Sequence, residues 1–542
     1  MDLILHGGAI YTMDRENRCV QAIAVADGII RAVGSDEEIL PLKTEHTTVI
    51  DLQGKTVVPG FNDSHMHLLS YGFSKEMAYL DPCQSMESLI QTVKDFIAEH
   101  EIPAGQWVEG RGWDQNQFPD KRLPSRLDLD LISTQHPIVL GRTCGQMCVA
   151  NTMAVEQLGL LHNPPQVDKG TAETDADGTA TGIFTGAAIN LVYGRLPKLG
   201  VARIKKAILN ACRDYVQAGL TSVQVDDFEL KRAGSHEDVL EAYFQLDRDK
   251  ELPLRVNLML YLPTYQDIKE FLALGYRTGD GSPYFRIGPC KTDTDGSLGG
   301  RTAALEEPYS DDPSTTGEIY YKAEELAQMV QLAYDNHCQF MCDGIGDRAL
   351  NMVIDAYAAV IEKHPEEDLR FGIDHCQITN DAIFERFKKY HLLAGLELGF
   401  VESDSYIIED RVGPERAKSC YNWKRFIDEG IPSCAGSDNP VEPYFPIHGI
   451  YAAVTRHNWD GEPKDGWLPE QRLSVEQAVR LFTEGSAYAT FEENEKGTLE
   501  TGKYADMAVL SDDPFTINPD RLEDISVTAT ITGGKVVFGS IN

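Results

Sequence analysis

The sequence predicts an α/β protein built on a (β/α)8 TIM barrel, with a small β-sandwich domain and an inserted cap region. Eight apolar, β-rich runs alternate with amphipathic segments, which is the pattern of parallel βαβ units. Short alternating runs broken by glycine turns occur at both ends of the chain. The first two barrel runs are separated by far more than the roughly 30 residues of a βαβ unit.

The eight predicted barrel strands are residues 57–62, 220–225, 255–260, 285–290, 339–342, 369–373, 392–396 and 431–435. Between the fifth and sixth, residues 348–364 place six apolar side chains on one helical face. These units predict a barrel over residues 57–496, with its active site at the carboxyl ends of the strands.

The two ends of the chain predict one small domain. Residues 1–56 form alternating runs with an Asp27-Gly28 hairpin signal, which predicts a small antiparallel sheet, and similar runs return in residues 497–542. We therefore expect a composite β-sandwich domain. The insertion, residues 71–205, follows the first barrel strand and is expected to form a cap that shapes the substrate pocket, with a peripheral scaffold as the alternative.

The composition and charge of the chain argue against some classes of function. The chain has 542 residues, 42% of them hydrophobic and 25% charged, as in soluble globular proteins. Its formal charge of −36 opposes binding to nucleic acid or to an anionic membrane. The amino terminus does not resemble a signal peptide, no long apolar run occurs, and the eleven cysteines lack C-x-x-C spacing. These features predict a cytoplasmic protein.

The stretch VVPGFNDSHMHLLS, residues 57–70, carries the first chemical signal. His65 and His67 are two residues apart, so at a strand end both imidazoles point to the same side. Such a pair can chelate zinc, iron, nickel or manganese. Two polar residues that end a strand by chance are the alternative.

Other predicted strands end in residues of the same chemical kind. Lys291 follows the fourth strand, Asp343 the fifth, His375 the sixth and Asp438 the eighth. Because the ends of parallel barrel strands meet at one rim, we expect these side chains to lie together. His337, His448 and His457 lie on helical or loop segments and are interpreted as surface or packing residues.

With these motifs in view, the chain resembles the amidohydrolase superfamily, in the branch of uncharacterised metal-dependent hydrolases that includes N-substituted formamide deformylase. The resemblance spans essentially the whole length. Its motifs are HGGAIYTMD, PGFNDSHMH, GWDQNQFP, KTDTDGSLGGRTA, GIGDRAL, DHCQ, GSDNPV and GTLETGKYADMAVL.

The resemblance implies roles for individual residues. His65 and His67 would bind a buried metal, and Asp438 would be both a ligand and the proton shuttle. Lys291 would be carboxylated by CO2 and bridge two metals, and His375 would hold the second metal. A carbamate is an anionic oxygen donor, unlike an ammonium. The alternative for Lys291 is an ordinary salt bridge to a nearby acid such as Asp293 or Asp295.

Three positions depart from the pattern of the branch. Asp343 stands where the resemblance implies a histidine, which lowers the charge of the site. This suggests a less electrophilic site, or a second metal that is weakly held or absent; hydrogen bonding in a polar rim is the alternative. Gln146 replaces a usual histidine and Gly186 a usual glutamate, which suggests a different substrate or degenerate activity. Trp113 and Arg301 are interpreted as substrate contacts or as structural residues.

The resulting functional prediction is a metal-dependent hydrolase. A metal-bound hydroxide would cleave a C–N bond in a small amide, N-formyl or cyclic amide compound, using one or two divalent metals per chain, with zinc favoured. A deaminase or ester hydrolase on the same scaffold and a non-catalytic paralogue are the alternatives. The expected partner is a small-molecule substrate. Relatives often form dimers, so a homodimer is one expected state.

Overall fold

The computed structural model describes residues 1–230 and 233–540, and the chain divides into two compact units. The first unit comprises Met1–Leu68, Ala211–Glu229 and Tyr243–Asn542. The second comprises Leu69–Asn210 and Leu230–Ala242. Within the described residues, no helix is both long and apolar enough to cross a membrane. The domain boundaries expected from the sequence, at residues 56/57 and 496/497 and around the insertion 71–205, remain predictions.

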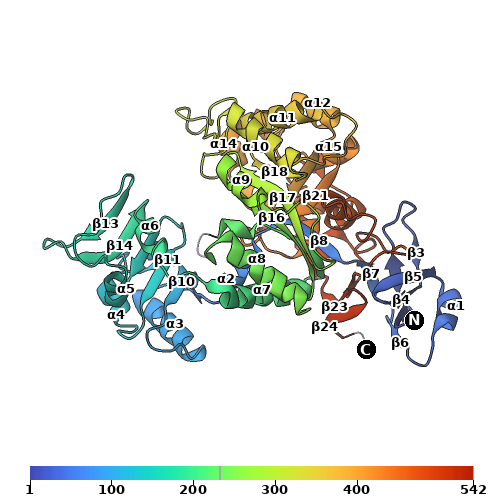
Figure 1. The fold of residues 1–542 in the computed structure, drawn as a ribbon, viewed down its shortest axis with the longest axis horizontal. Helices are drawn as coiled ribbons and strands as arrows, with labels where there is room; N and C mark the ends of the chain where they lie inside the picture. Colours follow the sequence, from blue (N-terminus) through green and yellow to red (C-terminus); the bar gives the residue numbers. More distant parts are fainter. Residues whose placement is uncertain (231–232, 541–542) are drawn as a thin grey trace. The chain divides into compact units, whose positions relative to one another are not determined.

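Eight parallel strands form the centre of the first unit (Figure 1). They lie in the order β21-β20-β19-β18-β17-β16-β15-β8, and the isolated parallel bridge between Met66 and Asn439 joins the two edges of this sheet. The barrel is therefore nearly closed, as the sequence predicts. Its strands are β8 (Phe61–Met66), β15 (Leu220–Val225), β16 (Arg255–Tyr261), β17 (Phe285–Asp293), β18 (Phe340–Gly344), β19 (Gly372–His375), β20 (Leu393–Glu397) and β21 (Ser433–Gly436).

Helices follow the barrel strands in the chain. The predicted helix over residues 348–364 is confirmed as α11 (Asp347–Ile361), whose buried face includes Leu350, Val353 and Tyr357. Its apolar stripe has the helical period, so burial against the strands stabilises it. The other helices of the first unit include α9 (Tyr265–Leu272), α10 (Ala323–Asp335), α12 (Asp381–Tyr390), α14 (Ile408–Ala417), α15 (Trp423–Asp428) and α17 (Val475–Arg480). The residues of α7 (Gly200–Gln217) and α8 (His236–Arg248) are divided between the two units.

The first predicted barrel strand, residues 57–62, is wrong, because it spans two strands of different sheets. β7 (Thr56–Pro59) pairs with strands from both ends of the chain, whereas β8 pairs with β15 in the barrel. The chain changes sheets at Gly60, whose backbone passes close to Thr221: an added Cβ would lie 2.2 Å from the Thr221 Oγ1 atom. A continuous apolar run cannot show such a division, since both halves are buried.

Replacing Gly60 by alanine is expected to destabilise the barrel by about 1–3 kcal/mol, because the new methyl group overlaps Thr221. Urea unfolding measures the effect as a lower midpoint. The matched control is Gly299→Ala, where the nearest atom would lie 3.4 Å from the new Cβ, an ordinary contact. Equal midpoints for the two variants would contradict this account of the Gly60 crossing.

The chain ends form two sheets. One has the order β5-β4-β1-β6, and the other, β24-β23-β22-β7-β2-β3, combines strands from both ends. The Asp27-Gly28 hairpin joins β4 to β5 with positive φ at both residues, as predicted. The expected antiparallel pairing is confirmed for β1–β4, β2–β3 and β4–β5. It is wrong for β1–β6 and β2–β7, which are parallel. The strands are β1 (Leu3–His6), β2 (Ala9–Tyr11), β3 (Cys19–Val20), β4 (Ala22–Ala26), β5 (Ile29–Gly34), β6 (Thr48–Asp51), β22 (Met507–Leu510), β23 (Val527–Thr532) and β24 (Lys535–Gly539).

The second unit has its own six-stranded sheet, in the order β13-β14-β12-β11-β10-β9, and two apolar clusters. The strands are β9 (Ala78–Tyr79), β10 (Val108–Trp113), β11 (Ile138–Arg142), β12 (Met147–Ala150), β13 (Gly170–Thr174) and β14 (Ala180–Gly186). The helices are α2 (Leu68–Ser74), α3 (Met86–Glu99), α4 (Arg126–Asp130), α5 (Thr152–Gln157) and α6 (Ile189–Tyr193).

A capping cluster at the start of α4 gives the second unit a pH-dependent contribution to stability. Burial alone would raise the pKa of Asp128, but hydrogen bonds from Arg122 and Ser125 lower it to about 2. Because the folded pKa lies below the unfolded value of about 3.9, the stabilisation is present above pH 4 and is lost as the pH falls toward 2.

We expect Asp128→Asn to lower the free energy of unfolding by about 1 kcal/mol at pH 7 and to have little effect near pH 2. Hydrogen exchange of the α4 amides at both pH values measures this difference. A loss of protection that is the same at both pH values would contradict the carboxylate's role.

Candidate metal centre

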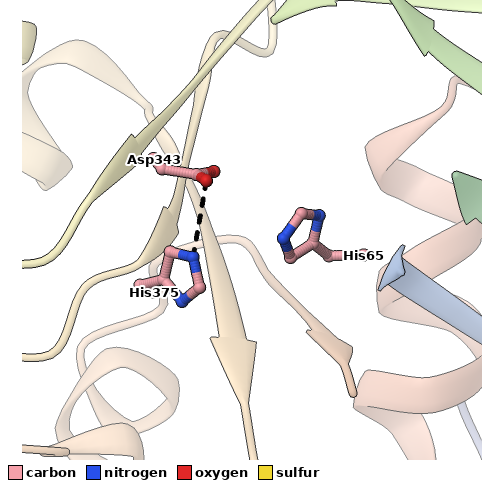
Figure 2. Close-up of side chains that lie close together, drawn as sticks. All are labelled: His65, Asp343 and His375. Atoms are coloured by element: carbon pink, nitrogen blue, oxygen red, sulfur yellow. Dashed lines mark ion pairs between the residues drawn. The ribbon is translucent and has the colours of Figure 1, made fainter. Parts of the chain in front are cut away.

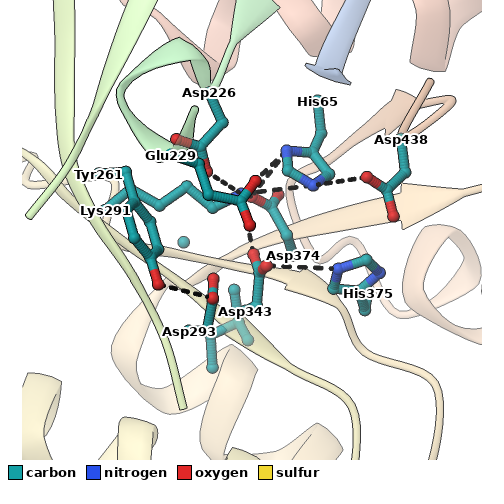
Figure 3. Close-up of polar contacts among 12 residues, drawn as sticks. His65, Asp226, Glu229, Tyr261, Lys291, Asp293, Asp343, Asp374, His375 and Asp438 are labelled. Atoms are coloured by element: carbon teal, nitrogen blue, oxygen red, sulfur yellow. Dashed lines mark hydrogen bonds and ion pairs between the residues drawn. The ribbon is translucent and has the colours of Figure 1, made fainter. Parts of the chain in front are cut away.

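The six predicted ligand residues converge at the carboxyl ends of the barrel strands. Each lies in a strand or within two residues of its end, so the sheet itself positions the side chains. The contacts run continuously through the group, as Figure 3 shows for most of them. The six are His65 in β8, His67 after β8, Lys291 in β17, Asp343 in β18, His375 at the end of β19 and Asp438 after β21.

One candidate ligand set consists of His65, His67 and Asp438. The Asp438 Oδ1 atom lies 3.0 Å from His67 Nε2 and 3.4 Å from His65 Nε2, and one potential ligand atom from each residue lies within 4.8 Å of the others. Asp438 has a φ of 56°, in the left-handed region that side chains with a Cβ seldom adopt. Such strain is typical of functional sites, where the surrounding structure holds the residue in place.

A second candidate set consists of His65, Asp343 and His375 (Figure 2). His375 Nε2 lies 3.5 Å from the Asp343 Oδ2 atom, and the His65 and His375 rings are 5.5 Å apart. Asp343 therefore faces the cluster, at the position where the sequence resemblance implies a histidine. His65 belongs to both sets, so the two sets share one imidazole.

Lys291 lies at the centre of the cluster and its side chain is fully buried. Its Nζ atom lies 2.9 Å from Asp343 Oδ1, 3.2 Å from Asp374 Oδ2 and 3.6 Å from Asp226 Oδ2. It is also 2.9 Å from His65 Nδ1. Burial alone would lower the pKa of this ammonium, but the three carboxylates raise it well above its usual value.

The partners suggested for Lys291 in the salt-bridge alternative are wrong. Asp293 instead accepts a hydrogen bond from the Tyr261 hydroxyl at 3.0 Å. Asp295 accepts from the backbone N–H groups of Ala304 and Gly346 at 2.7 and 2.9 Å. Sequence proximity misleads here because the acids that reach Lys291 come from neighbouring strands.

Several carboxylates of the cluster were missed in the sequence. Glu229 lies 3.1 Å from His67 Nδ1, and Glu397 lies 3.1 Å from His375 Nδ1, so each can orient an imidazole that could bind metal. The signal that could have found most of them is their place at strand ends. Asp226 follows β15, Asp374 lies in β19 and Glu397 ends β20.

The cluster carries more negative than positive groups. Seven carboxylates surround one lysine and three histidines. Burial, with Asp343 and Asp226 nearby, raises the pKa of Asp293 to about 8. Asp343 Oδ1, both Asp374 carboxylate oxygens and His375 Nδ1 are buried without a hydrogen bond of acceptable geometry. Imidazole nitrogens and carboxylate oxygens are the ligands of zinc-type divalent cations, so the residues present fit such ions.

The structure shows the contacts and the exposure of the three residues suggested as substrate contacts. The Trp113 ring is buried in an apolar cluster, and its N–H donates to the Leu140 carbonyl at 3.0 Å. Gln146 is exposed. The Arg301 guanidinium pairs with Asp311 at 2.8 Å. Their part in substrate binding stays a prediction.

The local backbone conformation explains why glycine occupies position 186. Its φ is 55°, and an added Cβ would lie 2.4 Å from the Lys169 carbonyl oxygen. A glutamate at this position would require the two strands to move apart. The backbone at this position therefore favours glycine over any residue with a Cβ.

Comparisons with known proteins agree with this geometry. A family model described as "Amidohydrolase family" matches residues 48–538. YtcJ of Bacillus subtilis, whose name places it among the amidohydrolases, is 33% identical over 99% of both chains. N-substituted formamide deformylase of Arthrobacter pascens is 25% identical, covering 99% of this chain and 98% of that protein.

A solved structure gives the same result. The crystal structure of an uncharacterised metal-dependent hydrolase from Pyrococcus furiosus superposes with a TM-score of 0.80 at 29% identity, covering 95% of this chain and all of the other. The family match extends over nearly the entire sequence, including the strands that carry the candidate ligands. The chain therefore belongs to the amidohydrolase family.

Proposed function

We propose that this protein is a metal-dependent hydrolase that cleaves a C–N bond in a small amide, N-formyl or cyclic amide compound. The observation that carries the proposal is the meeting of His65, His67 and Asp438 at the carboxyl ends of β8 and β21. The similarity to N-substituted formamide deformylase over the full length supports the N-formyl and amide classes.

His65, His67 and Asp438 would hold one divalent metal, and Asp343, His375 and a carboxylated Lys291 would hold a second. Zinc suits the imidazole and carboxylate donors best. When bound, such a metal polarises a substrate carbonyl and lowers the pKa of water toward about 7. The excess of carboxylates over cations supports two metals over one, because each neutralises buried negative charge.

Three other roles in the proposed reaction belong to side chains of this cluster. Asp438 would accept a proton from the attacking water and pass it to the departing amine; its contacts with His65 and His67, which keep Oδ1 at the centre of the proposed site, support this role. Glu229 and Glu397 fix the orientation of His67 and His375 through their Nδ1 atoms. Buried surroundings strengthen each of these electrostatic contacts.

Hydrolysis assays test the proposal directly. Zinc-loaded protein is incubated with panels of N-formyl amines, linear amides and cyclic amides, and amine release is measured before and after metal removal. We expect turnover of at least one class, loss after metal removal and recovery on adding zinc. A surface variant, His364→Gln, is the matched control and should match the wild type.

Two results would overturn the proposal. Turnover that survives complete metal removal would exclude a metal-dependent reaction. Hydrolysis restricted to esters, or release of ammonia from an aromatic amine alone, would replace the amide assignment by an ester hydrolase or a deaminase on the same scaffold.

A further inference from the structure

Asp63 lies in β8, two residues before His65, and its side chain is fully buried. One of its carboxylate oxygens, Oδ1, accepts a hydrogen bond from the backbone N–H of His65 at 3.1 Å. The same atom accepts a second hydrogen bond, also at 3.1 Å, from the backbone N–H of Ser437, which directly follows β21. A single oxygen atom therefore joins two segments that lie 374 residues apart in the sequence.

This contact lies where the two end strands of the barrel sheet meet. Within the described residues, β21 and β8 are joined by the isolated bridge between Met66 and Asn439 in place of a continuous ladder. Two backbone hydrogen bonds of 2.8 Å accompany the bridge at the rim. Asp438 N–H donates to the His65 carbonyl, and His67 N–H donates to the Asn439 carbonyl. We call this junction of β8 and β21 the seam.

Asp63 supplies an acceptor that the backbone does not supply at the seam. Buried backbone N–H groups nearly always have a hydrogen-bond partner, and between most strands the ladder provides it. The N–H groups of His65 and Ser437 instead find their acceptor in the Asp63 carboxylate. Without this oxygen, both would be donors without a partner. The side chain thus joins the two strands as ladder hydrogen bonds do elsewhere in the barrel.

The two strands approach each other closely beside this contact. At Gly436, the last residue of β21, an added Cβ would lie 2.8 Å from the His65 nitrogen and 2.9 Å from the His65 Cβ. Such distances are too short for a real Cβ atom, so any other residue would force the strands apart. Glycine therefore permits the spacing at which Asp63 reaches both N–H groups.

The first candidate ligand set spans the seam. His65 and His67 come from the β8 side and Asp438 from the β21 side, and the imidazoles lie 3.4 and 3.0 Å from the carboxylate. A shift of one strand along the other would separate the carboxylate from both imidazoles. In the second set, Asp343 and His375 lie in β18 and β19, which a continuous parallel ladder holds together. The first set therefore depends on another contact to fix its two sides.

We propose that Asp63 is a positioning residue that fixes β8 against β21 and so holds the first candidate ligand set in its metal-binding geometry. This role rests on the metal-dependent function proposed above. Asp63 acts through the backbone of the two residues that donate to it. Groups that orient metal ligands in this indirect way typically change metal affinity by about 10- to 100-fold when they are lost.

Zinc affinity, measured by competition with a chelator and without any substrate, tests the proposal. Asp63→Ala removes both accepted hydrogen bonds and should weaken zinc binding by about 10- to 100-fold. Asp63→Asn keeps a side-chain oxygen that can accept from the same N–H groups, so it should restore most of the affinity.

The control is Asn151→Ala in the second unit. Asn151 is also fully buried, and its Oδ1 atom accepts from the backbone N–H groups of Ile138 and Ala154 at 3.0 and 2.9 Å. The control therefore loses the same kind of contact away from the candidate ligands. It should lower the free energy of unfolding and leave zinc affinity unchanged, which separates positioning from general destabilisation.

A second variant keeps the test valid if Asp63→Ala fails to fold. Gly436→Ala keeps Asp63 but pushes β21 away from His65, and should also weaken zinc binding. Its control is Gly299→Ala, where the new Cβ would make an ordinary contact.

Three results would overturn the positioning role while the proposed function stands. They are wild-type affinity in Asp63→Ala or in Gly436→Ala, an equal loss of affinity in Asp63→Ala and Asn151→Ala, and a loss in Asp63→Asn as large as in Asp63→Ala. Wild-type protein that binds no zinc would overturn the proposed function, and the positioning role with it.

Discussion

Asp438→Asn is expected to lower kcat for amide hydrolysis by about 10³-fold, because positioned acid–base groups contribute roughly 10² to 10⁴ in rate. The amide cannot accept the proton that the carboxylate takes, although it keeps nearly the same shape. Burial alone would raise the pKa of Asp438, but His65 and His67 hold it well below its usual range, so the group is available as a base at neutral pH. Steady-state kinetics measure the loss.

The control for this variant is Asp381→Asn. Asp381 is 92% exposed at the start of α12 and pairs with Arg425, so its loss should leave kcat unchanged. Zinc content is measured in parallel, to separate loss of a base from loss of a ligand. An Asp438→Asn enzyme that keeps its metal and more than a tenth of the wild-type kcat would contradict the proton-transfer role.

Lys291→Met is expected to destabilise the metal-free protein by about 3–5 kcal/mol, the cost of leaving buried charges without a partner. Methionine fills a similar volume but leaves Asp226, Asp343 and Asp374 facing one another without the ammonium. Urea unfolding of the metal-free protein measures the loss. Lys388→Met, which removes a partly exposed ammonium paired with Glu385 and Glu429, is the control and should change stability much less.

The same position tests the carbamate. In metal-loaded wild type, native mass spectrometry should detect the added mass of CO2, and Lys291→Met should lack it together with the second metal. Metal-free Lys291→Met as stable as the metal-free wild type would contradict the ion-pair account. Two bound metals without added mass would leave Lys291 as an ammonium and exclude the bridging role.

The sequence predicts the barrel and most of the centre because parallel strands deliver their last residues to one rim. That rule finds His65, Lys291, His375 and Asp438 from their places after apolar runs. The rule misses Asp374. With strict alternation along β19, Asp374 and its neighbour His375 would point to opposite faces, so only one of them would reach the rim. His375 has a φ of 74°, which breaks the alternation and lets both side chains reach the cluster.

Other features depend on contacts between distant segments. The division of residues 57–62 at Gly60 is set by the close approach of Thr221, which no local pattern records. His448 was interpreted as a surface or packing residue because its two glutamate partners lie 46 and 75 residues away in the sequence. Tertiary structure brings these groups together, and periodicity along one segment cannot predict that.

Anomalous diffraction at the zinc edge, on crystals of protein purified without chelators and supplied with zinc, tests the central claim most directly. The account predicts a strong peak among His65, His67 and Asp438, with a second beside Asp343 and His375. Well-ordered side chains at these positions with no anomalous peak among them would contradict a metal centre at the barrel end and would favour a non-catalytic member of the family.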